Sequence, residues 1–279
     1  MIKVLHPGIY NTVQDIGRVG FAKKGIPQSG CMDSYSAELA NIALQNKLTS
    51  AVIEITYGQG KFEFLIDTLI LMTGGDFSPR IDTLPVLMDS VISIKKGSIL
   101  SFGKRNYGAR TYLAVLGGIQ SEVVFKSRSY LPGITKQRLE KGDELFIKSI
   151  PFPKEKNLGK VRFVSTHFSE NELQCYPGPE FDLLSENQKQ QLQKIFTISE
   201  ENNRVGFRLN EIIENNLQPI ITSAVIQGTV QLTPSGQLII LMRDCQVTGG
   251  YPRVLQLSEY AISRLSQKIR GDEVQFKLY

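Results

Sequence analysis

Residues 61–102 constrain the fold of this 279-residue chain more than any other stretch. Within it, short β-rich segments follow one another with turn signals between them: Phe62–Leu65, Thr68–Thr73, Val91–Ile94 and Ile99–Phe102. Such regular spacing is typical of a β-sandwich or a β-barrel and not of alternating βαβ units. The sequence therefore predicts a mainly β fold.

A few short helices are expected beside the strands. Asp33 or Ser34 begins the first, and Ser258 begins the third, which bears Ala261, Ile262 and Leu265. Ser185 begins the second, with Gln188 completing a capping box. For this second helix we expect a buried stripe of apolar side chains: Leu192, Ile195 and Phe196.

Composition excludes several classes of protein. Hydrophobic residues make up 41% and charged residues 21%, as in an ordinary globular protein. The net charge of +5 is spread along the chain without a basic stripe, which argues against a nucleic-acid interface. No apolar run is long enough to cross a bilayer and no signal peptide is visible. We therefore expect a cytoplasmic protein that does not bind a membrane. The 3 cysteines and 2 histidines lack metal-ligand spacing, so no metal site is expected.

The length favours one large domain or two of medium size. Pro151–Lys156 reads as a linker, and Val161–Ser165 restarts a strand. The ending Gly271-Asp272-Glu273 echoes Gly142-Asp143-Glu144, and a Gly-Gly pair recurs at nearly the same offset, at 117 and at 249. These repeats suggest two related β-rich halves, at 1–150 and 160–279.

Two polar, glycine-bearing stretches are candidates for a binding site. The first is the long irregular segment 11–33. The second, 244–252, follows a predicted hairpin, in which Gly228–Leu232 and Leu238–Met242 flank a proline–glycine turn. If that second strand continued, Asp244, Gln246 and Thr248 would lie on one face. We expect the two stretches to line one cleft.

The residues alone leave two interpretations open. Gln14 and Asp15 suit a ligand site, but they also suit loops whose amides need acceptors. Arg18 and Arg128 are either surface cations or guanidinium groups whose paired N–H donors bind a carboxylate or phosphate. Arg204 and Arg208, with Gly206 between them, form either an anion clamp or two ordinary surface ion pairs.

The motifs themselves resemble a known family. The segment from Thr12 to Asp33 resembles its opening Thr-Val-Gln-Asp-x-Gly-Arg-x-Gly and Gly-Val-Pro-x-Ser-Gly-Ala-Met-Asp, with Ile26 and Cys31 as departures. Phe125 to Ser129 resembles its Leu-Gly-Ser-Arg-Ser, and Asn203 to Leu209 resembles Asp-Arg-Met-Gly-x-Arg-Leu. The closing stretch resembles Asp-x-Gln-Thr-Thr-Gly-Gly-Tyr-Pro, with Val247 in place of the first Thr.

This family is the second carboxyltransferase subunit, which includes the C subunit of bacterial 5-oxoprolinase, subunit 2 of the allophanate-hydrolase type and part of urea amidolyase. The resemblance implies two cyclophilin-like β-barrel domains. It also implies an arginine partner for Glu54, which lies in the β-branched run 51–58. Candidate catalytic residues are Arg204, Arg208, Gln246 and Tyr251. Candidate substrate-binding residues are Gln14, Asp15, Arg18, Ser29, Asp33, Arg128, Thr248, Gly249 and Gly250.

The implied function is that of a C-subunit-like component of an ATP-dependent 5-oxoprolinase, which converts 5-oxo-L-proline to L-glutamate with separate A-subunit-like and B-subunit-like partners. The chain has no P-loop lysine motif, so any ATP site is unconventional or shared with a partner. One alternative is carboxyl transfer from carboxybiotin to urea or a related amide, with biotin carried by a partner because the chain has no biotin-acceptor Met-Lys pair. Another alternative is a non-enzymatic regulator of a kinase inhibitor.

Overall fold

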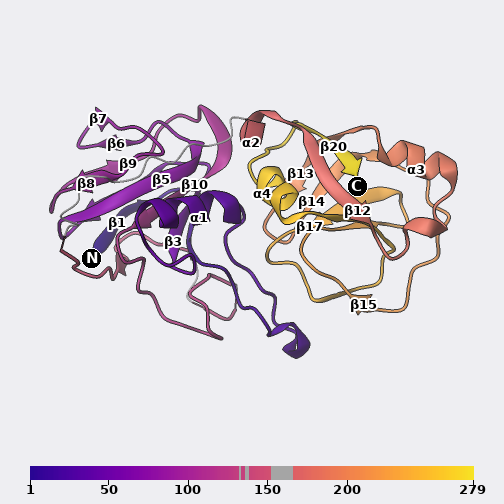
Figure 1. The fold of residues 1–279 in the computed structure, drawn as a ribbon, viewed down its shortest axis with the longest axis horizontal. Helices are drawn as coiled ribbons and strands as arrows, with labels where there is room; N and C mark the ends of the chain where they lie inside the picture. Colours follow the sequence, from indigo (N-terminus) through magenta and orange to yellow (C-terminus); the bar gives the residue numbers. More distant parts are fainter. Residues whose placement is uncertain (132, 136–137, 152–165) are drawn as a thin grey trace. The chain divides into compact units, whose positions relative to one another are not determined.

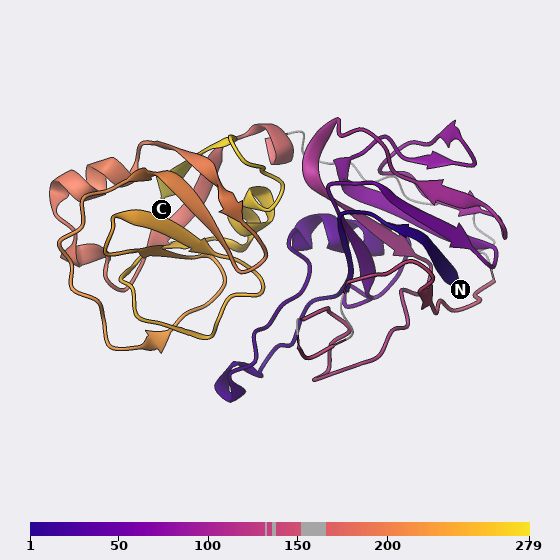
Figure 2. The same cartoon turned by 180° about the vertical axis from the view of Figure 1, so that it is seen from behind.

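The computed structural model describes residues 1–131, 133–135, 138–151 and 166–279. The chain divides into two compact units, one of Met1–Val19 and Ser29–Ser165 and one of Gly20–Gln28 and Thr166–Tyr279. The first unit is mostly indigo to magenta in Figure 1 and the second mostly orange to yellow, and Figure 2 shows the same elements from behind.

The predicted boundary between the two halves stays a prediction. Residues 152–165, which include most of the predicted linker and the strand predicted at Val161–Ser165, lie outside the described residues. The predicted opening stretch 11–33 is shared between the units, because Gly20–Gln28 groups with the second.

The first unit contains two sheets. One has six strands in the order β11 (Glu144–Leu145), β1 (Ile2–Pro7), β4 (Gly60–Phe64), β9 (Ile99–Ser101), β6 (Arg80–Ile81) and β7 (Leu84–Pro85). The other has five strands in the order β2 (Tyr10–Gln14), β3 (Val52–Thr56), β10 (Tyr107–Val115), β5 (Thr68–Asp76) and β8 (Ile92–Ile94). One hydrophobic core draws on both sheets, with Val4 and Phe62 from one and Ile53 and Leu113 from the other. The four strands predicted between residues 61 and 102 are therefore confirmed.

Helix α1 (Ser34–Ala43) covers the outer face of the five-stranded sheet (Figure 1). Small side chains, Ala37 and Ala40, pack against Leu71 and Ala114 of that sheet, which allows the helix to approach closely. Asp33 is its N-cap, and its carboxylate accepts a hydrogen bond of 2.9 Å from the backbone of Ser36. The predicted helix start is confirmed, with Asp33 and not Ser34 as the cap.

Glu54 is fully buried on β3, and its expected arginine partner is Arg110, with 3.9 Å between Oε1 and Nε. Its other oxygen accepts hydrogen bonds from the Tyr112 hydroxyl at 2.9 Å and the Met32 amide at 2.8 Å. Burial, followed by the nearby Glu54 charge, raises the pKa of Tyr112 well above its usual value. The carboxylate thus ties the sheet to the segment that leads into α1.

The second unit is a closed barrel. Its strands run in the order β12 (Glu172–Pro177), β19 (Arg253–Leu257), β16 (Thr229–Leu232), β17 (Gln237–Leu241), β14 (Gly206–Ile212), β13 (Ile195–Asn202) and β20 (Glu273–Leu278). The predicted hairpin is confirmed, because β16 and β17 pair antiparallel around Pro234-Ser235-Gly236. A small separate sheet joins β15 (Ser223–Ala224) to β18 (Thr248–Gly249).

In the described residues, helices are few and short, as predicted. Beside α1, the chain forms the α-helices α2 (Thr166–Ser169), α3 (Glu186–Leu192) and α4 (Glu259–Leu265) and the 3-10 helices η1 (Ala22–Lys24) and η2 (Phe181–Leu183). Both predicted helix caps are confirmed: Ser185 forms a capping box with Gln188, and the Ser258 side chain accepts a hydrogen bond from the Ala261 amide. Within the described parts of the chain, no helix is long and apolar enough to span a membrane.

The predicted stripe on the second helix is wrong for two of its three residues. Helix α3 ends at Leu192, and Ile195 and Phe196 lie on strand β13. Phe196 is buried in the barrel, whereas Ile195 is 56% exposed, as alternation along a strand requires. Spacing at i, i+3 and i+4 fits a helix equally well, so the pairing of β13 with β20 decides the outcome.

The repeated Gly-Asp sequence forms the same kind of turn at both places. Asp143 accepts from the Glu140 amide at 3.0 Å, and Asp272 accepts from the Ile269 amide at 2.8 Å. Gly142 and Gly271 both adopt positive φ, at 93° and 85°. The two Gly-Gly pairs do not match in this way, because only the pair at 117 and 118 has positive φ.

Candidate functional site

Asp15 in the first unit organises two loops that are far apart in sequence. Its carboxylate accepts hydrogen bonds from the Ser127 hydroxyl at 2.6 Å, the Ser129 hydroxyl at 2.7 Å and the Arg128 amide at 2.6 Å. It also accepts from the amide of Gly17 at 2.8 Å. This geometry favours the loop-building interpretation of Asp15, because its lone pairs are already occupied by the chain.

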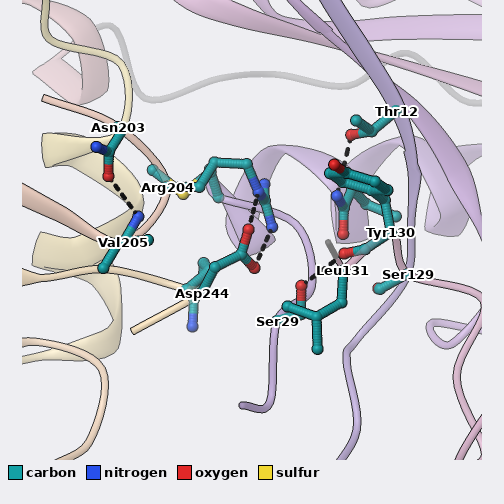
Figure 3. Close-up of polar contacts among 12 residues, drawn as sticks. Thr12, Ser29, Ser129, Tyr130, Leu131, Asn203, Arg204, Val205 and Asp244 are labelled. Atoms are coloured by element: carbon teal, nitrogen blue, oxygen red, sulfur yellow. Dashed lines mark hydrogen bonds and ion pairs between the residues drawn. The ribbon is translucent and has the colours of Figure 1, made fainter. Parts of the chain in front are cut away.

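Two other predicted binding residues, Arg18 and Ser29, join the same loop pair. Arg18 is fully buried and donates to the carbonyl of Ser129. The Ser29 hydroxyl donates to the carbonyl of Tyr130 at 2.9 Å (Figure 3). Gln14 is buried as well, and its amide donates to the Thr12 hydroxyl at 3.0 Å. The structure therefore brings Asp15, Arg18 and Ser29 together with 127–130 as buried parts of loop architecture, whereas Gln14 contacts its own strand, β2.

Arg128 differs from these because its side chain borders open space. It lines a pocket of about 280 Å³ in the first unit, together with Gln120 and the carboxylates of Glu122 and Glu144. Its guanidinium lies 3.4 Å from the Gln120 amide oxygen, a weak hydrogen bond. Arg128 remains a candidate for binding a small anion.

In the second unit, the expected continuation of the hairpin strand is wrong. Strand β17 ends at Leu241, and a turn at residues 243–244 follows it. Asp244 is buried whereas Gln246 and Thr248 are exposed, so the three do not share a face. A buried ion pair explains the break, since the Asp244 carboxylate takes both the Nε and Nη2 donors of Arg204, at 2.7 Å and 3.0 Å (Figure 3).

The turn before β14 is fixed by Asn203. Its side-chain oxygen accepts from the Val205 amide at 2.8 Å (Figure 3) and from the Gly206 amide at 3.1 Å. An aspartate, the residue expected here from the family pattern, has an oxygen in the same place, so the departure at Asn203 keeps the turn while removing a charge.

Arg204 and Arg208 have different carboxylate partners. Arg208 lies on the outer side of β14, 44% exposed at its side chain, with its Nη1 2.9 Å from Glu201. Arg204 is turned inward to Asp244. The predicted clamp stays a prediction, and of the two side chains Arg208 is the more accessible to a ligand.

Arg208, Gln246 and Tyr251 do come together. They line a pocket of about 480 Å³ whose walls belong entirely to the second unit, and Gly206 forms part of it. The rim carries two carboxylates, Glu200 and Glu201, which are paired with Arg270 at 2.8 Å and with Arg208. We call this cavity the barrel pocket.

The barrel pocket also contains a residue that sequence reasoning missed. Gln231 on β16 is 2% exposed, lines the pocket, and has an amide nitrogen without a hydrogen-bond partner among the described residues. Gly249 packs directly against it: a Cβ added to Gly249 would lie 2.6 Å from the Gln231 nitrogen. The available signal was one polar residue between Val230 and Leu232, which face the core.

The comparisons with known proteins agree with this architecture. The family described as "Carboxyltransferase domain, subdomain A and B" matches residues 24–278. The chain belongs to this family. The carboxyltransferase-domain chain is also 32% identical to the 5-oxoprolinase C subunit of Escherichia coli over 285 residues, which cover 99% of this chain and 90% of that protein.

Other relatives of the carboxyltransferase family are larger. Urea amidolyase of Lachancea kluyveri is 28% identical, with 98% of this chain and 17% of that protein covered. Two solved structures cover 99% of this chain: TTHA0988, at 26% identity and a TM-score of 0.87, and K. lactis urea amidolyase, at 28% identity and 0.88. The chain spans 55% of the TTHA0988 chain and 18% of the amidolyase chain. All these matches confirm the mainly β carboxyltransferase-domain fold, whereas the roles predicted for individual residues stay predictions.

The barrel pocket offers a mixed set of binding groups. Arg208 supplies a planar cation, Gln246 and Gln231 supply amides, and Tyr251 supplies a hydroxyl. Such a set suits a small ligand with a carboxylate and an amide better than a purely apolar one. The predicted cleft shared by the opening and closing stretches also stays a prediction.

Proposed function

We propose that this chain is the C-subunit-like component of an ATP-dependent 5-oxoprolinase, which opens 5-oxo-L-proline to L-glutamate. The alignment with the 5-oxoprolinase component of E. coli is the observation that carries the proposal, because it extends over 90% of that protein as well as 99% of this chain. The Haemophilus influenzae protein of the same name adds a second alignment, at 27% identity and 91% coverage.

Opening of the lactam ring requires binding groups of the kind found in the barrel pocket. A lactam is inert to water, so the reaction needs its carbonyl activated and its ring held in place. A guanidinium such as that of Arg208 can hold the substrate carboxylate through two parallel hydrogen bonds. Amide side chains such as Gln246 can orient the ring by donating to or accepting from the lactam group.

The barrel pocket does not suit ATP itself. Its lining residues supply one cation, Arg208, beside the carboxylates of Glu200 and Glu201, which can balance a single ligand carboxylate but not the several negative charges of a triphosphate. We therefore assign nucleotide binding to another part of the complex with the A-subunit-like and B-subunit-like proteins. The barrel pocket is assigned to the small amide substrate.

Carboxyl transfer to urea or a related amide is the second candidate. The family description and the matches to urea amidolyase favour it. In that case carboxybiotin would arrive on a partner protein. The relatives reported above are named as enzymes or subunits of enzymes, so they lend no support to the regulator alternative.

The deciding experiment co-expresses this chain with its A-subunit-like and B-subunit-like partners and measures ATP hydrolysis. We expect hydrolysis to depend on added 5-oxo-L-proline and to require this chain. Hydrolysis that ignores 5-oxo-L-proline, together with urea-dependent consumption of carboxybiotin by the same preparation, would instead support carboxyl transfer.

A further inference from the structure

One row of side chains crosses three neighbouring strands of the barrel. Ile239 on β17 pairs with Arg208 on β14 on one side and with Gln231 on β16 on the other. Directly paired residues point to the same side of a sheet, and all three line the barrel pocket. The pocket floor is therefore a cation, an apolar side chain and an amide, in that order.

The spacing of this row limits what can lie across it. Two strand spacings separate the Arg208 and Gln231 backbones, roughly 10 Å in all. The long arginine side chain can close part of that gap. A ligand in contact with both ends must be small, with an anionic group near Arg208, a hydrogen-bonding group near Gln231 and an apolar part over Ile239.

Gln231 is the member of the row that points most clearly to a ligand. Its side chain is buried, and one of its two amide positions makes no hydrogen bond within the described ranges. Rotating the amide by 180° exchanges nitrogen and oxygen but leaves one position open. Leaving a buried polar group unpaired is unfavourable, so a partner in the pocket is expected.

Gly249 defines the space around this amide. Strand β18 carries Gly249 against Gln231, and its pairing with Ser223 of β15 holds it there. Any side chain at 249 would displace the amide, because its Cβ would be 2.6 Å from the Gln231 nitrogen and 3.2 Å from Val225. Glycine thus keeps the inner end of the pocket shaped around the amide.

The charges on the rim allow an incoming carboxylate. Glu201 is 63% exposed at its side chain and holds Arg208 at 2.9 Å, so a ligand carboxylate can replace it at little cost in desolvation. Glu200 is paired with Arg270.

We infer that Gln231 is a specificity-determining residue, which hydrogen-bonds the lactam amide of the substrate while Arg208 holds its carboxylate across Ile239. The choice of ligand, a five-membered lactam with a carboxylate, rests on the proposed function. Gln231 then distinguishes 5-oxo-L-proline from L-proline, which has the same ring and carboxylate but no lactam carbonyl.

The test compares Gln231→Met, which keeps the side-chain volume and removes the amide, with Gln174→Met as control. Gln174 is exposed on β12 of the same barrel and donates to the Tyr279 hydroxyl. In the reconstituted complex we expect Gln231→Met to raise the KM for 5-oxo-L-proline tenfold to a hundredfold, roughly the loss of a hydrogen bond to a buried group. Gln174→Met should change it less than about twofold.

A second measurement uses calorimetric titration of the full chain with 5-oxo-L-proline and with L-proline. We expect the native protein to prefer 5-oxo-L-proline, and Gln231→Met to bind both alike. A folded Gln231→Met variant with native KM and native preference overturns the inference but leaves the proposed function intact. Gln231-dependent binding in a complex without 5-oxoproline-dependent ATP hydrolysis contradicts the proposed function and supports the inference.

If Gln231→Met does not fold, crystals of the native chain soaked with 5-oxo-L-proline decide the matter. The lactam amide within hydrogen-bond distance of the Gln231 side chain supports the inference. The ligand at any other place, or no ligand at concentrations where the complex is saturated, overturns it.

Discussion

Arg204 and Asp244 form a two-point ion pair that joins the turn before β14 to the turn after β17. Their side chains meet at 2.7 Å and 3.0 Å, and the Asp244 amide also donates to the Arg204 carbonyl at 2.8 Å. Both side chains are buried. Because Gly206 and Gln246 of the barrel pocket follow these two turns, the pair fixes the relative position of two of its walls.

Removing one partner of this pair should destabilise the fold strongly. For Asp244→Ala we expect a loss of about 3–5 kcal/mol in the free energy of unfolding, because Arg204 keeps a buried charge without its carboxylate. Urea unfolding measures the loss. The matched control is Glu201→Ala, which removes the partner of the exposed Arg208 and should cost less than about 1 kcal/mol. Equal losses in both variants would show that the Asp244 pair contributes no more than a surface pair.

Arg204 and Arg208 should respond differently to replacement by lysine. As half of an exposed clamp, Arg204 would tolerate lysine without loss of stability. As the buried partner of Asp244 it should not, because lysine cannot reproduce the two parallel hydrogen bonds. We expect Arg204→Lys to lower the melting temperature clearly and Arg208→Lys to change it little. Equal melting temperatures of the two variants would contradict the structural role of Arg204.

The two adjacent glycines of the closing stretch should respond differently to alanine. A Cβ at Gly249 would press on Gln231 and Val225, whereas a Cβ at Gly250 would meet only the Ile220 carbonyl, at 3.5 Å. We expect Gly249→Ala to cost about 1–3 kcal/mol of stability, as overpacking does, and Gly250→Ala to cost less. Thermal and urea unfolding of the pair decides this, and the reverse order would show that Gly249 does not pack as described.

Asp89 in the first unit should make stability depend on pH. Burial, and then the nearby charge of Asp76, raises its pKa to about 7. Between pH 4 and pH 7 the folded state therefore binds more protons than the unfolded state, and stability falls as pH rises through this window. Above pH 7 Asp89 is ionised in both states, so its contribution no longer changes.

Replacing Asp89 by asparagine should remove this slope and raise stability at pH 8. Asparagine also tolerates the positive φ of 60° found at this position. Since Asp89 is partly exposed, solvent screening reduces the gain to roughly 1 kcal/mol. Melting temperatures at pH 5 and pH 8 measure it, with Asp182→Asn, an exposed carboxylate of the second unit, as control. An Asp89→Asn variant with the native pH profile would exclude Asp89 as the source.

The sequence predicted those parts of the fold that depend on local signals. The Ser185–Gln188 capping box and the Asp33 cap need only residues three positions apart, and both are present. The prediction of a buried helical stripe is right for Leu192 and wrong for Ile195 and Phe196, because their helical spacing is indistinguishable from a helix end followed by a strand until β13 is paired with β20. Distant pairing is a tertiary effect that overrides local preference.

The candidate site shows the same limit. Arg208, Gln246 and Tyr251 were found from motifs and do meet in one pocket. Gln231 could not be found, because its position beside Ile239 and Arg208 depends on the register of three strands. Likewise, the sequence leaves open whether Asp15 binds a ligand or builds a loop, and only its contacts with Ser127 and Ser129 favour the second.

A stable complex with a smaller partner is expected from the relationship to 5-oxoprolinase, whose name for this component marks it as one of several subunits. Co-expression with the B-subunit-like protein should yield one species in size-exclusion chromatography at micromolar concentration. The isolated chain serves as the reference. Two separate peaks for the co-expressed pair would contradict a stable assembly of this kind.

The most direct test of the account is the KM for 5-oxo-L-proline in the reconstituted complex carrying Arg208→Lys. Lysine keeps the charge but loses the fork that holds a carboxylate, so we predict a KM about tenfold higher or more, with kcat affected less. Arg80→Lys, an exposed arginine in the first unit that donates to the Thr83 carbonyl, should leave the KM unchanged. A native KM for Arg208→Lys would contradict the assignment of the barrel pocket as the substrate site.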